Sequence, residues 1–153
     1  MSLRSIIAML LVLATAACST YPYRKEFDAN PPFAPHYYRY FDVAVAWQSE
    51  RTGRDVRLSG TVTNQRDVYL RDLELTGLLL DGKGNVLARA TSDDFPTYLP
   101  SGKAASFQMR FSIVDGTIPA RLRLKYSYLL AEEPPAVRGY GDTPHFGSFD
   151  APL

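Results

Sequence analysis

The chain has 153 residues, enough for one domain of ordinary size and too few for two. Its 17 Lys and Arg nearly balance its 16 Asp and Glu, so we expect no general attraction to nucleic acid. A single cysteine excludes an internal disulfide, and the core must therefore depend on apolar burial.

The first 18 residues have the order of a secretory signal. Arg4 precedes an apolar run at residues 6–13, and the small residues Thr15, Ala16 and Ala17 precede Cys18. This segment resembles the bacterial lipoprotein signal, in which the cysteine is acylated and the chain is cut before it. The resemblance implies a signal peptide at residues 1–17, a lipid on Cys18 and the membrane as a partner.

Two alternatives to lipidation remain open. Cleavage after Ala17 by an ordinary signal peptidase would release a soluble protein with a free thiol. Without cleavage, residues 6–17 are too short to cross a bilayer, which needs about 20 apolar residues. Ser19 follows the cysteine, where some bacteria read Asp as an inner-membrane retention mark. By that resemblance we expect an outer-membrane protein that faces the periplasm.

Residues 18–36 contain four prolines and no apolar periodicity, which predicts an extended, lipidated tether. From residue 37 to residue 131, apolar and polar side chains alternate with a period of two. Strict alternation is typical of strands with one buried face and one solvated face. The alternating segments are residues 41–48, 56–63, 72–80, 86–91, 105–113 and 121–130.

Six half-buried strands indicate two antiparallel sheets packed on each other. We therefore predict an all-β, immunoglobulin-like antiparallel sandwich of about six to seven strands at residues 37–131. Asp81 to Asn85 predicts a hairpin loop. In the strand at residues 105–113, the alternation places Phe107 in the core and Gln108 in solvent.

Residues 132–153 lose the alternation and are rich in proline and glycine. This composition predicts a loose C-terminal tail. Its aromatic residues, Tyr140, Phe146 and Phe149, favour a tail that is partly docked on its own domain. The alternative is a short peptide that engages a partner.

Part of the sandwich region resembles the bacterial FxLYD domain family. The matching features are a Gly-x-Val-x-Asn segment at residues 60–64, Asp81 with Gly84, and Pro100 with Gly102 ahead of Phe107. The resemblance covers residues 58–111. It implies a β-sandwich interaction module outside the cytoplasm, with no catalytic residues.

No arrangement of chemically active side chains stands out in the sequence. The two histidines, His36 and His145, fall in predicted linkers, and a metal site needs three or four convergent ligands. No serine lies in a Gly-x-Ser-x-Gly elbow. We therefore predict no enzyme activity, no metal and no cofactor.

The candidate interaction surface contains a basic stripe and two tyrosines. Arg121, Arg123 and Lys125 share the solvent face of one predicted strand, and Tyr38 and Tyr40 are expected to be exposed. The stripe is interpreted as a solvated strand face that discourages edge pairing, or as a site for an anionic partner.

These observations favour a lipid-anchored envelope protein whose sandwich acts as a protein-interaction or assembly accessory module. The partners would be the membrane and another envelope protein. The alternative is a periplasmic binder or carrier of a small apolar or anionic ligand.

Overall fold

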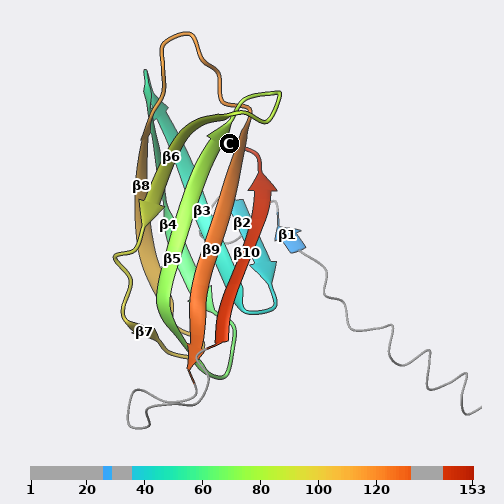
Figure 1. Ribbon diagram of the computed structural model, residues 1–153, viewed down its shortest axis with the longest axis vertical. Helices are drawn as coiled ribbons and strands as arrows, with labels where there is room; N and C mark the ends of the chain where they lie inside the picture. Colours follow the sequence, from blue (N-terminus) through green and yellow to red (C-terminus); the bar gives the residue numbers. More distant parts are fainter. Residues whose placement is uncertain (1–25, 29–35, 132–142) are drawn as a thin grey trace, which may run out of the picture.

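The computed structural model describes residues 26–28, 36–131 and 143–153, and every regular element in these residues is a strand (Figure 1). No stretch of this described chain forms an apolar helix of membrane-spanning length. The strands are β1 (Glu26–Asp28), β2 (His36–Tyr40), β3 (Val43–Thr52), β4 (Asp55–Asn64), β5 (Tyr69–Leu80), β6 (Val86–Ser92), β7 (Tyr98–Leu99), β8 (Ala104–Ser112), β9 (Arg121–Ala131) and β10 (Thr143–Ala151).

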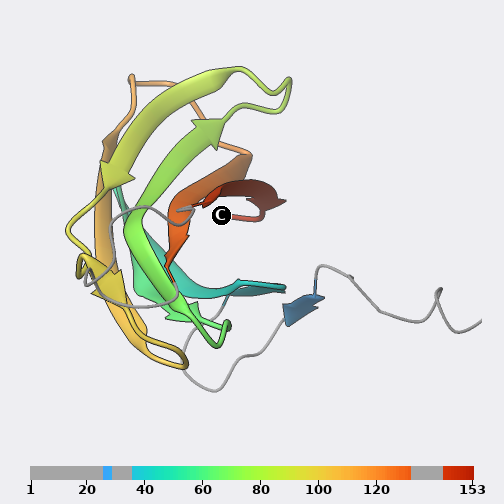
Figure 2. The same cartoon turned by 60° about the horizontal axis from the view of Figure 1, so that its bottom comes forward.

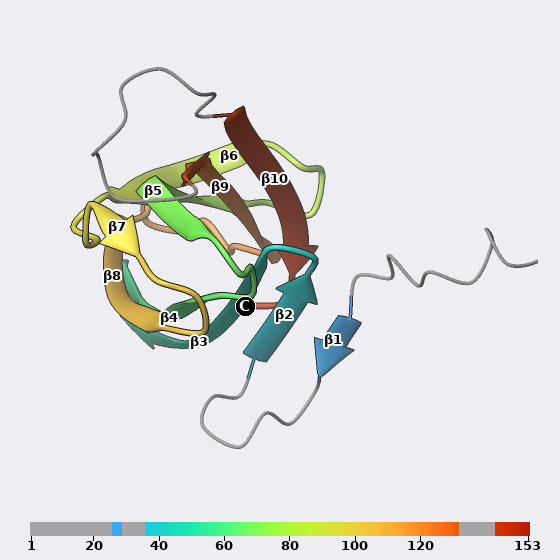
Figure 3. The same ribbon diagram turned by 90° about the horizontal axis from the view of Figure 1, so that it is seen from below.

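The strands form two sheets, and every pairing is antiparallel. One sheet has the order β1-β2-β3-β4-β8, and the other has the order β10-β9-β5-β6, with β7 on β5. The sheets curve around a common interior (Figure 2). Seen from below, β2 and β10 approach each other at one side, and β6 and β8 do so at the other (Figure 3). The predicted all-β, immunoglobulin-like sandwich is confirmed.

The six strands predicted from alternation correspond to β3, β4, β5, β6, β8 and β9. In β8 every second side chain is buried, as expected for a strand with one face on the core. Phe107 is buried and Gln108 is exposed, so the predicted register of this strand is confirmed. The predicted hairpin loop at residues 81–85 joins β5 to β6, where Asp81 accepts hydrogen bonds from the backbone amides of Lys83 and Asn85.

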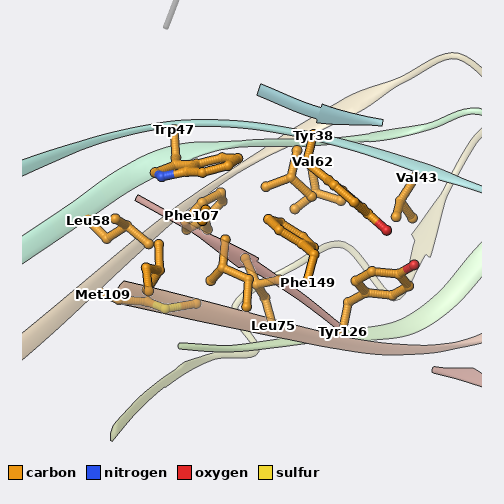
Figure 4. Close-up of a cluster of buried hydrophobic side chains, with 14 of the residues drawn as sticks. Tyr38, Val43, Trp47, Leu58, Val62, Leu75, Phe107, Met109, Tyr126 and Phe149 are labelled. Carbon is orange, nitrogen blue, oxygen red and sulfur yellow. The ribbon is translucent and has the colours of Figure 1, made fainter. Parts of the chain in front are cut away.

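The interior is filled by large side chains from both sheets, including Trp47, Phe107 and Leu75 (Figure 4). Gly77 on β5 shows how closely the sheets pack. A Cβ atom at this position would lie 2.6 Å from Cζ of Phe111. The Phe111 ring, from the opposite sheet, therefore occupies the space of a side chain at residue 77.

A buried asparagine joins the end of β4 to the loops beside it. Asn64 is 0 % exposed, and its side-chain amide donates to the carbonyl oxygens of Val68 and Leu99 at 2.7 and 2.9 Å. Its side-chain oxygen accepts from the amide of Arg66 at 2.8 Å. The backbone oxygen of Asn64 also accepts from the amide of Gly102. Two residues of the Gly-x-Val-x-Asn and Pro-x-Gly segments thus meet at one end of the sandwich.

The chain turns back at Phe41 and Asp42, where the sequence analysis expected one continuous strand. Tyr40 pairs with Val43 across this two-residue hairpin, and Phe41 has a φ of 27°. Such hairpins usually carry Asn or Gly at left-handed positions, and this one carries neither. The β2 strand was therefore missed as a separate strand, and His36, which was placed in the tether, belongs to the sandwich.

The boundary predicted at residue 131 was also wrong. Residues 143–151 form β10, a regular strand paired with β9 from Thr143 to Ala151. Phe149 and Ala151 are buried in the core. Residues 143–151 are therefore docked on the domain and not loose, as the docked interpretation expected, whereas residues 132–142 lie outside the described residues.

Candidate functional site

A groove on the outer face of the β10-β9-β5-β6 sheet is the candidate site. It has a volume of about 610 Å³, which is within the usual range for ligand pockets. The groove is open and crosses the full width of the sheet. Its lining is mostly polar and comes from all four strands: Glu74, Thr76, Arg89, Lys125, Tyr126, Ser127, Phe146, Gly147 and Ser148.

The strand pairings explain why these side chains meet. Ser127 lies opposite both Phe146 on β10 and Glu74 on β5. One step along β9, Lys125 lies opposite both Ser148 and Thr76. Since directly paired residues lie on the same face of a sheet, these two cross-strand rows form the floor of the groove.

Phe146 is the exposed aromatic residue of this groove. Its side chain is 85 % exposed, although β10 is paired along its whole length. The neighbouring inward residue, Phe149, is 4 % exposed. Phe146 thus adds no packing to the core, and aromatic residues are enriched in protein interfaces.

The predicted basic stripe is only partly free. The guanidinium of Arg123 binds the carboxylate of Asp150 on β10 through two contacts, of 2.5 and 2.9 Å. Arg121 also lies 3.7 Å from this carboxylate. These contacts raise the pKa of Arg123, first through the hydrogen bond and second through the opposite charge. Lys125 is the third residue of the stripe; it forms no such ion pair with Asp150, and it lies in the groove.

The two predicted surface tyrosines do not form an exposed patch. Tyr38 is 0 % exposed, and Tyr40 is partly buried against the core. The prediction for Tyr38 was wrong because the hairpin at Phe41 and Asp42 makes β2 a separate strand. In this strand Tyr38 lies opposite Val45 and faces the interior.

Tyr38 and Tyr126 meet inside the sandwich. Their hydroxyl groups point toward each other (Figure 4). Burial, followed by the hydrogen bond to Tyr126, raises the pKa of Tyr38. Tyr126 passes over Gly147 of β10, where a Cβ atom would collide with the Tyr126 hydroxyl. A glycine at residue 147 is therefore needed for this arrangement.

A second polar cluster surrounds the buried carboxylate of Asp42. Tyr128 donates a hydrogen bond to its Oδ2, and Nε of Arg66 lies 3.3 Å from its Oδ1. His145 lies with Nδ1 3.9 Å from Oδ2, and its ring is stacked on that of Tyr128. Burial, followed by the bond to Asp42, raises the pKa of Tyr128. This cluster holds the turn before β3 against β9 and β10.

Both histidines therefore lie on strands and not in linkers. His36 on β2 is stacked on Trp47, with ring centroids 5.4 Å apart. His145 lies on β10, at the Asp42 cluster. Among the described residues, no group of three or more His, Cys, Asp or Glu side chains is placed to hold a metal ion. The predicted lipidation residue, Cys18, lies outside the described residues.

Comparisons with known proteins show no family. The sequence matches no family model and no curated protein. A pentahaem cytochrome c552 from Thermochromatium tepidum is similar in structure at 13 % identity and a TM-score of 0.49, over 73 % of this chain and 40 % of the cytochrome. AvmM, which catalyses macrocyclization in alchivemycin A biosynthesis, is similar at 11 % identity and a TM-score of 0.40, over 71 % of this chain and 88 % of AvmM. Similarities at this level do not indicate a shared function.

Proposed function

We propose that this protein is a lipid-anchored envelope protein whose sandwich binds another envelope protein through the outer groove. The exposed ring of Phe146, on an edge strand that is paired with β9 along its whole length, is the observation that carries this proposal. The signal-like segment ending at Cys18 supports the anchor and the envelope location. More than one acyl chain makes such an anchor stable, because each buried methylene contributes about 0.8 kcal/mol.

The filled interior favours interaction over carriage of a small apolar ligand. A carrier needs an apolar cavity between its sheets, whereas here Trp47, Phe111 and Phe149 occupy that space. A partner of the described sandwich can instead contact large apolar side chains that are exposed on its surface, among them Phe146.

We assign no chemical step to the sandwich. Several buried polar side chains converge at the Asp42 cluster. Oδ2 of Asp42 accepts a hydrogen bond from Tyr128, and Oδ1 forms an ion pair with Arg66. His145 lies beside Asp42 and is stacked on the ring of Tyr128. The cluster is therefore better explained as a structural lock.

Fractionation of cells tests the anchor. The native protein should separate with the outer membrane on a sucrose gradient, and Cys18→Ser should be unprocessed or soluble. Mass spectrometry of the purified protein should find an acylated cysteine at its N-terminus. A soluble native protein with an unmodified thiol would contradict the proposal.

Site-specific photo-crosslinking in living cells tests the interaction. A photoreactive phenylalanine analogue at residue 146 should give a discrete cross-linked product with one envelope protein. The matched control is the same analogue at Gln108, which is exposed on the outer face of the opposite sheet. Equal products from both positions, or none from residue 146, would argue against the groove as the contact surface.

A further inference from the structure

The charges in the groove are distributed unevenly along the strands. Glu74 lies in the same cross-strand row as Phe146, whereas Lys125 lies in the next row. Arg89 on β6 lies opposite Leu78, and Leu78 lies opposite Arg123, one row further. The groove therefore has an acidic side next to the exposed ring and a basic side beyond it.

The two cations at the basic side have no acidic partner of their own. In the same sheet, Arg121 and Arg123 are both close to Asp150. By contrast, neither Lys125 nor Arg89 forms an ion pair with any residue that the structure describes, and both side chains are exposed. Thr76 lies opposite Lys125, but it is buried and its hydroxyl donates to Glu74 at 3.3 Å, so the donors at the basic side are the two cations. This is a set of donors that suits a carboxylate.

The acidic residue of the groove, Glu74, helps to distinguish a protein partner from an anionic membrane. A uniformly anionic surface, such as an anionic membrane, would place negative charge against Glu74 as well as against Lys125. A peptide segment can instead alternate its charges and can also bring an apolar side chain to Phe146. The observed charge pattern therefore favours a protein segment over a lipid surface.

On the basis of the proposed function, we infer that the groove recognises a short segment of a partner protein with three features. An acidic residue meets Lys125 and Arg89, an apolar or aromatic residue contacts Phe146, and a basic or amide group meets Glu74. The cations orient the segment, and the ring contributes the apolar contact.

Selection of heptapeptides on phage, with the mature protein in detergent as the target, tests this inference. The enriched peptides should carry Asp or Glu together with an apolar or aromatic residue. One enriched peptide, made synthetically and labelled, should bind Lys125→Glu/Arg89→Glu at least about tenfold more weakly. The matched control is Arg57→Glu/Lys103→Glu, which adds the same charge change at exposed positions outside the groove and should bind as the native protein does.

Glu74→Lys provides a second variant, and it should remove the preference for a basic or amide group in the enriched peptides. Enriched peptides without acidic residues, or equal binding to the charge-reversed variant, would overturn the inference. It would also be overturned if phosphatidylglycerol vesicles bound the native protein through Lys125, because the groove would then be a lipid site. If the charge-reversed variant bound the peptide as the native protein does, and photo-crosslinks at residue 146 were still formed, the inference would be refuted. The proposed function would then remain intact.

Discussion

Tyr38 and Phe149 lie face to face, with ring centroids 3.6 Å apart and ring planes 10° from parallel (Figure 4). Tyr38 belongs to β2 in one sheet, and Phe149 belongs to β10 in the other. The stack therefore closes one side of the sandwich, which we call the Tyr38–Phe149 seam. Trp47 also contacts Phe149, with ring centroids 5.6 Å apart.

The first prediction concerns this seam. Phe149→Ala should lower the free energy of unfolding by about 3–5 kcal/mol, because it leaves a cavity beside Tyr38 and Trp47. The control is Phe146→Ala in the same strand, which should change stability by no more than about 0.5 kcal/mol because that ring is exposed. Urea unfolding followed by circular dichroism measures both. Similar losses at the two positions would mean that β10 does not contribute to the core.

The second prediction concerns the boundaries of the folding unit. A fragment of residues 37–131 lacks β10, and with it the buried side chains of Phe149 and Ala151. It should unfold at a lower urea concentration than a fragment of residues 36–153 and should bind a hydrophobic dye. If the shorter fragment were equally stable, β10 would be dispensable.

The third prediction tests the register of β8. Phe107→Ala should cost roughly 3–5 kcal/mol, whereas Gln108→Ala should cost no more than about 0.5 kcal/mol. The contrast arises because a shift by one residue would exchange the two faces of the strand. Equal effects would contradict the burial pattern of this strand.

The fourth prediction concerns Asn64. Asn64→Ala removes three hydrogen bonds and leaves buried partner groups unsatisfied, so we expect a loss of at least about 2 kcal/mol. Gln65→Ala is the control, since the described contact of Gln65 is made by its backbone amide. A loss below about 0.5 kcal/mol for Asn64→Ala would show that water replaces these bonds.

The fifth prediction concerns alkaline pH. Burial raises the pKa of Tyr38, Tyr126 and Tyr128, so the folded state keeps protons that the unfolded state loses near pH 10. The stabilising contribution of these tyrosines is therefore complete below about pH 10 and falls above it. Each such tyrosine can contribute a slope of at most about 1.4 kcal/mol per pH unit. Tyr38→Phe should remove the contribution of one tyrosine from the slope of the unfolding free energy against pH. Urea unfolding curves measured at several pH values above about 10 check this, and an unchanged slope in the variant would contradict the prediction.

The sequence predicted those strands whose two faces differ in polarity. In β8 and β9, apolar and polar residues alternate, and both strands were found. In β2 nearly every residue is aromatic, so the two faces cannot be distinguished. In β10 the inward positions include His145 and Gly147, which are not apolar, and Pro144 reads as a strand breaker. These two inward residues lie opposite Tyr128 and Tyr126 of β9, and only the folded structure brings them together.

Only one residue of the groove, Lys125, was predicted from the sequence as part of a candidate surface. Lys125 was expected on the solvent face of its strand, and it lies there. Arg89, Glu74 and Phe146 were not linked with it, because their proximity depends on the order β10-β9-β5-β6. The pairing of Asp150 with Arg123 depends on β10 and was missed for the same reason.

The Tyr38–Phe149 seam also has a consequence for the kinetics of folding. Its two strands are far apart in the sequence and lie in different sheets, so the seam can close only after the strands between them are in place. Chains dominated by such distant contacts fold slowly, in milliseconds to seconds. Until closure, the rings of Tyr38, Trp47 and Phe149 would be open to solvent and to neighbouring chains. The newly made chain therefore passes through a period in which protection by a chaperone would matter most.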